Sequence, residues 1–109
     1  MTFTKEDQWE QFSEIMKLHM IDYVMPQYGN FPSKTIQGWN EAKIAGKLEA
    51  YVDRIGKGRR GIEDQVRDAI KIADFGRYLL AYLVTGSAEG DLSVFIDDMK
   101  YRVEKGNAK

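Results

Sequence analysis

Hydrophobic residues recur at helical spacing in several stretches of the chain, and no stretch shows the strict alternation of an exposed β-strand. We predict helices over residues 5–24, 40–55, 62–84 and 91–104. Both prolines lie between the first two of these stretches, so the rest of the chain is free to be helical. The pattern therefore predicts an all-α fold, a compact bundle of about four helices that forms one domain over residues 1–109.

Residue types at the ends of the predicted helices support these boundaries. Thr4 and Asp7 have the spacing of a capping pair, and Asn40 is a good N-cap for the second helix. Pro26 is expected to end the first helix, and Gly56 to end the second.

A long loop is predicted between the first two helices, over residues 26–39. This segment is rich in proline, glycine and aromatic residues (PQYGNFPSKTIQGW). Loops of this length are often functional or form lids. The alternative is that its aromatic rings simply cover the end of the bundle.

The first predicted helix is hydrophobic on two sides. One side has the pattern of a core face and consists of Trp9, Phe12, Met16, His19, Met20 and Tyr23. The opposite side carries Leu18, Ile21 and Met25. A helix of this kind usually contacts something on both sides, so we predict that the second side is an interface with another chain, unless a loop covers it.

The helix predicted over residues 62–84 is the most hydrophobic segment, yet a polar stripe runs along it. The stripe consists of Asp64, Arg67, Lys71, Asp74 and Tyr78. The predicted core residues of the same helix are Val66, Ala69, Ile70, Ala73, Leu80, Leu83 and Val84. Charged groups beside a core must be paired or solvated, so the stripe either faces water or forms a site. Tyr78 either stacks on a planar ligand or caps the core with its hydroxyl in water.

A short basic turn, rich in glycine, precedes this helix. Lys57, Arg59 and Arg60 lie in it, at the positive end of the helix dipole. With Arg54, Arg67, Lys71, Asp74 and Tyr78 they form the predicted ligand site, a cradle for a phosphate or another anion. The alternative is a solvated turn between two helices.

Four carboxylates on the two central helices form a second candidate site. They are Glu49, Asp53, Asp64 and Asp68. Antiparallel neighbouring helices would bring these pairs face to face, where they could bind Mg²⁺. The alternative is ordinary surface charge. The single histidine and the absence of cysteine argue against a zinc site, and no serine has the setting of a catalytic nucleophile.

Composition narrows the function classes. The net charge is −1, which gives no strong nucleic-acid signal, and the absence of cysteine excludes disulfides. The first residues lack the hydrophobic region of a signal peptide, and no segment is long and hydrophobic enough to span a bilayer. We therefore predict a cytoplasmic protein with no membrane partner.

Several short motifs carry a family resemblance over about residues 20–80. They are Tyr28-Gly29-Asn30, Trp39, Gly46-Lys47-Leu48-x-x-Tyr51-Val52-x-Arg54 and Glu63-Asp64-x-x-x-Asp68-x-x-Lys71-x-x-Asp74. In these motifs the chain resembles small helical proteins of tailed bacteriophages, often encoded near nucleotide-metabolism genes. More distantly it resembles the MazG-like all-α nucleoside triphosphate pyrophosphohydrolases, although it lacks their Glu-Glu-x-x-Glu motif.

The resemblance implies a helical, self-associating protein with a phosphate-bearing ligand, in the host cytoplasm if a phage encodes it. Our first hypothesis is a non-enzymatic, homo-oligomeric accessory protein that binds a nucleotide-like ligand and has no cofactor. The second is a Mg²⁺-dependent nucleotide pyrophosphohydrolase of the MazG type. The third is a protein-only adaptor or inhibitor that binds a host protein. We favour the first or the third.

Overall fold

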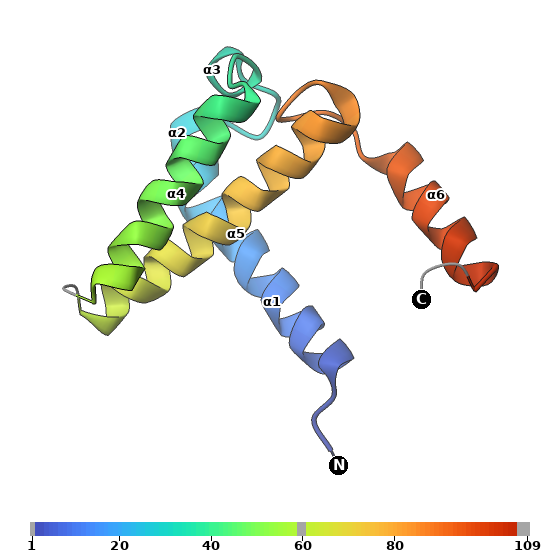
Figure 1. Cartoon of the computed structure of the whole chain (residues 1–109), viewed down its shortest axis with the longest axis horizontal. Coiled ribbons are helices and arrows are strands. Elements are labelled where there is room, and N and C mark those ends of the chain that lie inside the picture. The colour runs from blue at the N-terminus through green and yellow to red at the C-terminus, as the bar shows by residue number, and fades with distance from the viewer. Residues whose placement is uncertain (1, 59–60, 107–109) are drawn as a thin grey trace.

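The computed structural model describes residues 2–58 and 61–106, and its regular secondary structure in these ranges is helical throughout (Figure 1). The elements are α1 (Lys5–His19), the π-helix η1 (Met20–Val24), α2 (Met25–Tyr28), α3 (Lys34–Gln37), α4 (Glu41–Lys57), α5 (Ile62–Thr85) and α6 (Ser93–Glu104). The predicted all-α class is therefore confirmed. No helix in the described ranges combines the length and the hydrophobicity needed to cross a membrane.

The first helical stretch continues past Pro26, so the prediction that this proline ends it is wrong. Pro26 lies in the first turn of α2, where a proline needs no hydrogen-bond partner for its missing N–H. The preceding π-helix makes this possible, because its wider turn lets the N–H of Met25 donate to the carbonyl of Met20. The predicted loop is also shorter than expected, since α3 interrupts it after its N-cap, Ser33.

The predicted caps of the long helices are confirmed. The N–H of Asp7 donates to the hydroxyl of Thr4 (3.1 Å), and the N–H of Thr4 donates to the carboxylate of Asp7 (2.9 Å). Asn40 caps α4 by accepting from the N–H of Lys43. The end of α4 lies two residues beyond the prediction, because Gly58 and not Gly56 adopts the left-handed conformation, with φ 61°.

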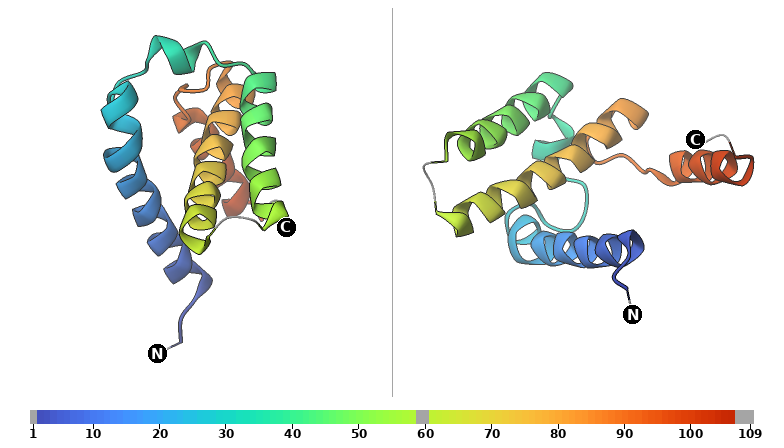
Figure 2. Two further views of the ribbon diagram at one scale, coloured as in Figure 1. Left: turned by 90° about the vertical axis from the view of Figure 1, so that its left-hand side faces the viewer. Right: turned by 60° about the horizontal axis from the view of Figure 1, so that its bottom comes forward.

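Helices α4 and α5 run antiparallel and form the centre of the molecule (Figures 1 and 2). The small core beside them consists of Ile36, Ile44, Tyr78 and Ala88. Ala88 belongs to the segment between α5 and α6. A hydrogen bond from the backbone N–H of Ser33 to the carboxylate of Glu89 (2.7 Å) attaches this segment to the start of α3.

Helix α5 is oriented with its polar stripe inward, and this reverses the predicted core face. Asp74 and Tyr78 are buried against the rest of the chain. By contrast Val66, Leu80 and Leu83 are 50%, 43% and 61% exposed, so their prediction as core residues is wrong for a single chain. The aromatic ring of Tyr78 supplies the apolar surface that buries this side of α5.

Both terminal helices extend away from the centre (Figures 1 and 2). The N-terminal half of α1 projects past α5, and its predicted core residues Trp9 and Phe12 are exposed. On α6 the side chains of Ile96, Met99 and Val103 are exposed as well. The radius of gyration is 15.9 Å, against about 13 Å for a compact domain of this length, so the chain is less compact than predicted.

Candidate ligand-binding site

Several helices and one loop converge on a cavity of about 200 Å³ between α1, α2, α4 and α5. We call it the aromatic pocket. Its walls are His19, Tyr23, Val24, Gln27, Tyr28, Trp39, Lys47, Tyr51, Lys71, Asp74, Phe75 and Tyr78. Most of these side chains are aromatic or charged, a combination that binding sites use to hold and orient a small molecule.

Trp39 organises the aromatic wall of the pocket. Its indole stacks on Phe75, with ring centroids 5.5 Å apart and planes within 12°. The rings of Tyr78 (5.4 Å) and Tyr28 (6.2 Å) meet it edge to face. Both arrangements are favoured by the quadrupoles of aromatic rings, so the neighbours hold one another in fixed orientations.

Lys71 brings a positive charge to the same pocket. Its ammonium group lies 5.1 Å from the ring centroid of Tyr23 and 5.6 Å from that of Tyr51. These cation–π contacts draw the flexible side chain to the pocket. A second cation, Lys47, reaches the pocket from the exposed side of α4.

The one carboxylate of the pocket wall, Asp74, is compensated by a neighbouring cation. Its Oδ1 accepts from Nη2 (2.7 Å) and Nε (2.9 Å) of Arg77, and His19 Nε2 lies 3.9 Å from Oδ2. The Asp74 side chain is only 8% exposed, so this pairing offsets the cost of burying its charge. The charges of Lys47 and Lys71 have no such partner among the ion pairs of the described residues.

The pKa values of two phenols of the pocket, Tyr23 and Tyr78, are shifted in opposite directions. Burial raises the pKa of Tyr78, and the negative charge of Asp74 raises it further. A hydrogen bond with the Gln27 side chain lowers the pKa of Tyr23, and the positive charge of Lys71 adds to this. Because the pKa of Tyr78 is raised above the ordinary value of about 10, its phenol keeps its proton at neutral pH and can donate a hydrogen bond.

A larger groove of about 760 Å³ adjoins the aromatic pocket. The two share His19, Tyr23 and Lys71. The groove adds Arg67 on α5 and the carboxylate of Asp22 on η1. Its apolar wall consists of Ile15, Leu18, Ile21, Pro26 and Ile70. A molecule that leaves the aromatic pocket past Lys71 therefore meets a second cation.

The structure separates the residues of the predicted ligand site. Lys71, Asp74 and Tyr78 line the aromatic pocket, and Arg67 lines the groove. Arg54 lies elsewhere: its guanidinium is 3.7 Å from the carboxylate of Asp68 and lies over the ring of Tyr51. Lys57 pairs with Asp53 at 2.9 Å, while Arg59 and Arg60 fall outside the described residues. The predicted cradle at the basic turn is thus not assembled from Arg54 and Lys57.

The predicted metal ligands do not gather into one site. No group of three or more acidic, histidine or cysteine side chains in the described ranges is arranged to hold a metal ion, and all four candidates, Glu49, Asp53, Asp64 and Asp68, lie in these ranges. Asp53 faces Lys57, and the buried Asp68 faces Arg54. Two of the four predicted ligands, Asp53 and Asp68, are thus paired with cations on their own or the neighbouring helix.

Two residues of the predicted interface, Leu18 and Ile21, are each 57% exposed and line the groove. The third, Met25, is half-buried. Leu18 and Ile21 therefore lie beside the ligand-binding candidate, and their role as an interface stays a prediction.

The sequence analysis missed Lys47, Trp39 and Tyr51 as members of the ligand site. Lys47 and Tyr51 are four residues apart and therefore share a face of α4. Lys71 and Phe75 have the same relation on α5, the antiparallel neighbour. Two matching lysine–aromatic pairs on adjacent helices were the signal that could have located this pocket.

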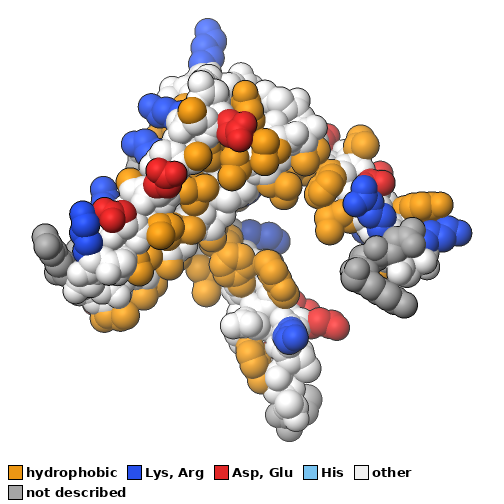
Figure 3. All heavy atoms as spheres, viewed as in Figure 1, with side chains coloured by type: hydrophobic (Ala, Val, Ile, Leu, Met, Phe, Trp, Pro, Cys, Tyr) orange, Lys and Arg blue, Asp and Glu red, His pale blue; other side chains and the backbone are white. Residues whose placement is uncertain are grey.

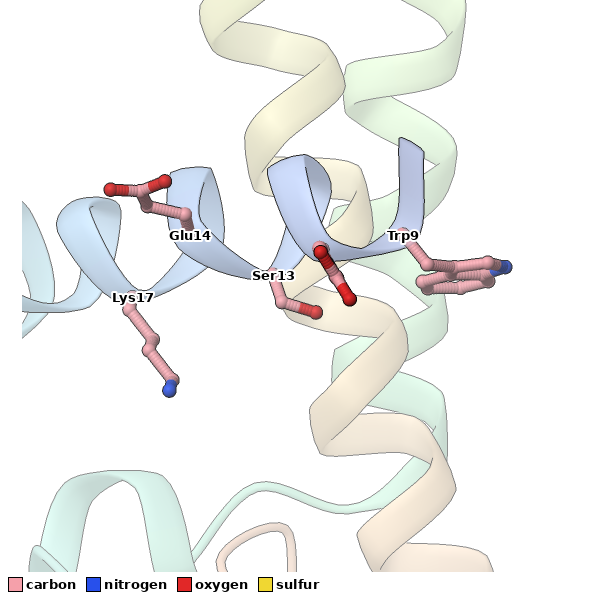
Figure 4. A pocket seen from close by; sticks show the side chains of 5 residues that line it. Trp9, Ser13, Glu14 and Lys17 are labelled. Carbon is pink, nitrogen blue, oxygen red and sulfur yellow. The ribbon is translucent and has the colours of Figure 1, made fainter. Parts of the chain in front are cut away.

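A separate hollow lies on the outer side of α1 (Figure 4). All its lining residues, Trp9, Glu10, Ser13, Glu14 and Lys17, come from this one helix. In the close-up, Trp9 and Lys17 point away from each other. A single helix cannot enclose a ligand, so this hollow is an open surface of α1.

No family model, curated protein or solved structure matches the chain. The function is therefore inferred from the aromatic pocket and the groove.

Proposed function

We propose that this chain is a small, non-enzymatic binding protein for a nucleotide-like phosphate ligand. The observation that carries the proposal is the convergence of aromatic rings and uncompensated lysines on one pocket. Planar bases stack on aromatic side chains in a sequence-tolerant way, and phosphates are attracted by lysine and arginine. The aromatic pocket supplies the first interaction, and its mouth supplies the second.

The volumes of the aromatic pocket and the groove suggest which part of the ligand each would bind. The aromatic pocket of about 200 Å³ holds a planar ring, whereas sites for whole ligands of this class measure about 300–1,000 Å³. We place the base in the aromatic pocket and the phosphate in the groove, between Lys71 and Arg67. The groove has room for the sugar and the phosphate, and Lys47 adds positive charge from α4.

Binding, and not catalysis, is the activity proposed. Asp74 lines the aromatic pocket and its charge is paired with Arg77, and Asp22 lines the groove. In the described ranges the four carboxylates required by the pyrophosphohydrolase hypothesis do not form a group of three or more that could hold a metal ion. The accessory role in a phage-infected host, implied by the resemblance, remains a prediction.

Isothermal titration calorimetry with AMP, GMP, CMP and UMP tests the proposal. We expect binding of at least one nucleotide, and Lys71→Met should weaken it about 10- to 100-fold, since a hydrogen bond to a charged group contributes about 1.5–3 kcal/mol. Lys57→Met is the matched control, because Lys57 is also a lysine in a helix but pairs with Asp53 away from the pocket. Its affinity should equal that of the unmodified chain.

Two further ligands separate the contributions. The nucleoside should bind more weakly than its monophosphate and should lose little affinity in Lys71→Met, because it lacks the phosphate. Affinity for the monophosphate should fall as salt is raised, since the groove is open to solvent. No binding of any of the four monophosphates at millimolar concentration, or equal weakening by Lys57→Met, would reject the proposal.

A further inference from the structure

Helix α5 carries a second regular pattern on the side that faces away from the aromatic pocket. Apolar or small residues recur at alternating intervals of four and three along it. They are Ile62, Val66, Ala69, Ala73, Gly76, Leu80 and Leu83. This is the heptad spacing at which one helix packs along another, and we call the set the α5 seam.

In the part of the chain that the structure describes, no helix covers the large residues of the α5 seam, whereas its central residues Ala73 and Gly76 are half-buried. Its large members Ile62, Val66, Leu80 and Leu83 are all exposed. The polar and aromatic residues of α5 occupy the inward side, where α4 lies. In the space-filling view hydrophobic side chains lie along α5 and continue on the neighbouring parts of α1 and α6 (Figure 3).

The distribution of side-chain size along the α5 seam is nearly symmetric. The small residues Ala69, Ala73 and Gly76 form its centre, and large apolar residues occupy both ends. A second α5 running in the opposite direction would therefore place small residues against small ones. At the ends it would bring Val66 close to Leu80 of the other copy. A two-fold interface requires this kind of self-complementarity.

The exposed area of the chain agrees with a missing partner. The chain exposes 8528 Å², about 2,300 Å² more than the roughly 6,200 Å² expected for a compact monomer of 12.5 kDa. Two copies that covered this excess would bury about 4,600 Å² in total, within the range of about 2,000–5,000 Å² found for obligate homodimers.

We infer that two copies of this chain form an antiparallel dimer along the α5 seam. The small central residues let the two helix backbones approach closely, and the projecting apolar residues of α1 and α6 extend the contact. This inference goes beyond the proposed function and does not depend on it, because the seam and the aromatic pocket lie on different sides of α5.

A second copy fits the α5 seam better than a membrane or an unrelated protein. The symmetric order of residue sizes has a direct explanation only for a partner with the same order. A membrane surface would meet the acidic residues Glu10 and Glu14 on the projecting part of α1. The net charge of −1 is small enough that two copies repel each other little.

Sedimentation equilibrium of the full chain tests the assembly. The expected mass is twice 12.5 kDa at micromolar concentration. Ala73→Arg should return the mass to that of one chain, because it places two like charges at the centre of the interface. Ala50→Arg is the control, since Ala50 is an exposed alanine in the middle of α4. A single-chain mass for the unmodified protein, or a dimer that survives Ala73→Arg, would overturn the inference.

Thiol cross-linking tests the orientation without requiring a destabilising change. The chain has no cysteine, so every cross-link reports an introduced pair. The double variant Val66→Cys/Leu80→Cys should form covalent dimers with a short bismaleimide. Within one helix these positions are about 21 Å apart, too far for the reagent to bridge. Val66→Cys should not cross-link to its counterpart, and efficient dimer formation by this single variant would instead show parallel helices and refute the antiparallel arrangement.

Discussion

The Asp74–Arg77 pair should contribute measurably to stability, and Arg77→Met tests this. Asp74 is 8% exposed and accepts two hydrogen bonds from the guanidinium, whereas the Arg77 side chain is 46% exposed. Loss of one partner of a buried pair costs about 3–5 kcal/mol. Because solvent screens the half-exposed Arg77, we expect a smaller loss, about 1–3 kcal/mol in the free energy of unfolding.

Urea unfolding followed by circular dichroism measures this loss, with all variants at one protein concentration because a dimer links stability to concentration. The double variant Asp74→Asn/Arg77→Met should recover about 1 kcal/mol or more relative to the sum of the single changes, since neither charge is then left unpaired. Arg102→Met is the control: its exposed pair with Asp98, at 3.0 Å, should contribute about 0–0.5 kcal/mol. Additive effects of the Asp74 and Arg77 changes, or an equal loss in Arg102→Met, would refute the reasoning.

Two further predictions follow from local geometry. Burial and the charge of Asp74 raise the pKa of Tyr78, so the stability that its neutral phenol contributes is complete below about pH 10 and is lost as the pH rises through the raised value. Thermal melts should therefore show that Tyr78→Phe loses less stability than the unmodified chain between about pH 9 and pH 11, and an identical loss would contradict this. Gly90→Ala should destabilise the chain by about 1–3 kcal/mol, because a Cβ there would collide with the Thr85 side chain. Gly46→Ala, which meets open space in the middle of α4, should stabilise it by about 0.5–1 kcal/mol in the same melts, and the opposite order would contradict the packing described here.

Local signals in the sequence predicted the helices well. Thr4, Asp7 and Asn40 act through hydrogen bonds to neighbouring residues, so their roles follow from spacing alone. The prediction at Pro26 failed where a π-helix precedes the proline, and two residues of this π-helix, Tyr23 and Val24, line the aromatic pocket. No pattern of hydrophobic residues announces such a turn.

The orientation of α5 was the harder problem, since periodicity shows that a helix has two different sides but not which one faces its own chain. The sequence pattern predicts the more hydrophobic side of α5 as the core face. In the structure Phe75 and Tyr78, on the more polar side, pack against Trp39 and bury Asp74 with them. The aromatic rings of Phe75 and Tyr78 thus give the side of α5 that also carries charged residues enough apolar surface to form a core.

The two sides of α5 together account for both proposals. An exposed seam of leucine, isoleucine and valine costs solubility in a lone chain, whereas the seven-residue repeat and the central small residues are what a paired helix requires. In the proposed dimer a second copy covers the α5 seam, and the predicted core face of α5 is then buried between the two chains. The polar side lines the aromatic pocket within each chain, so under the two proposals one helix serves assembly with one face and ligand binding with the other.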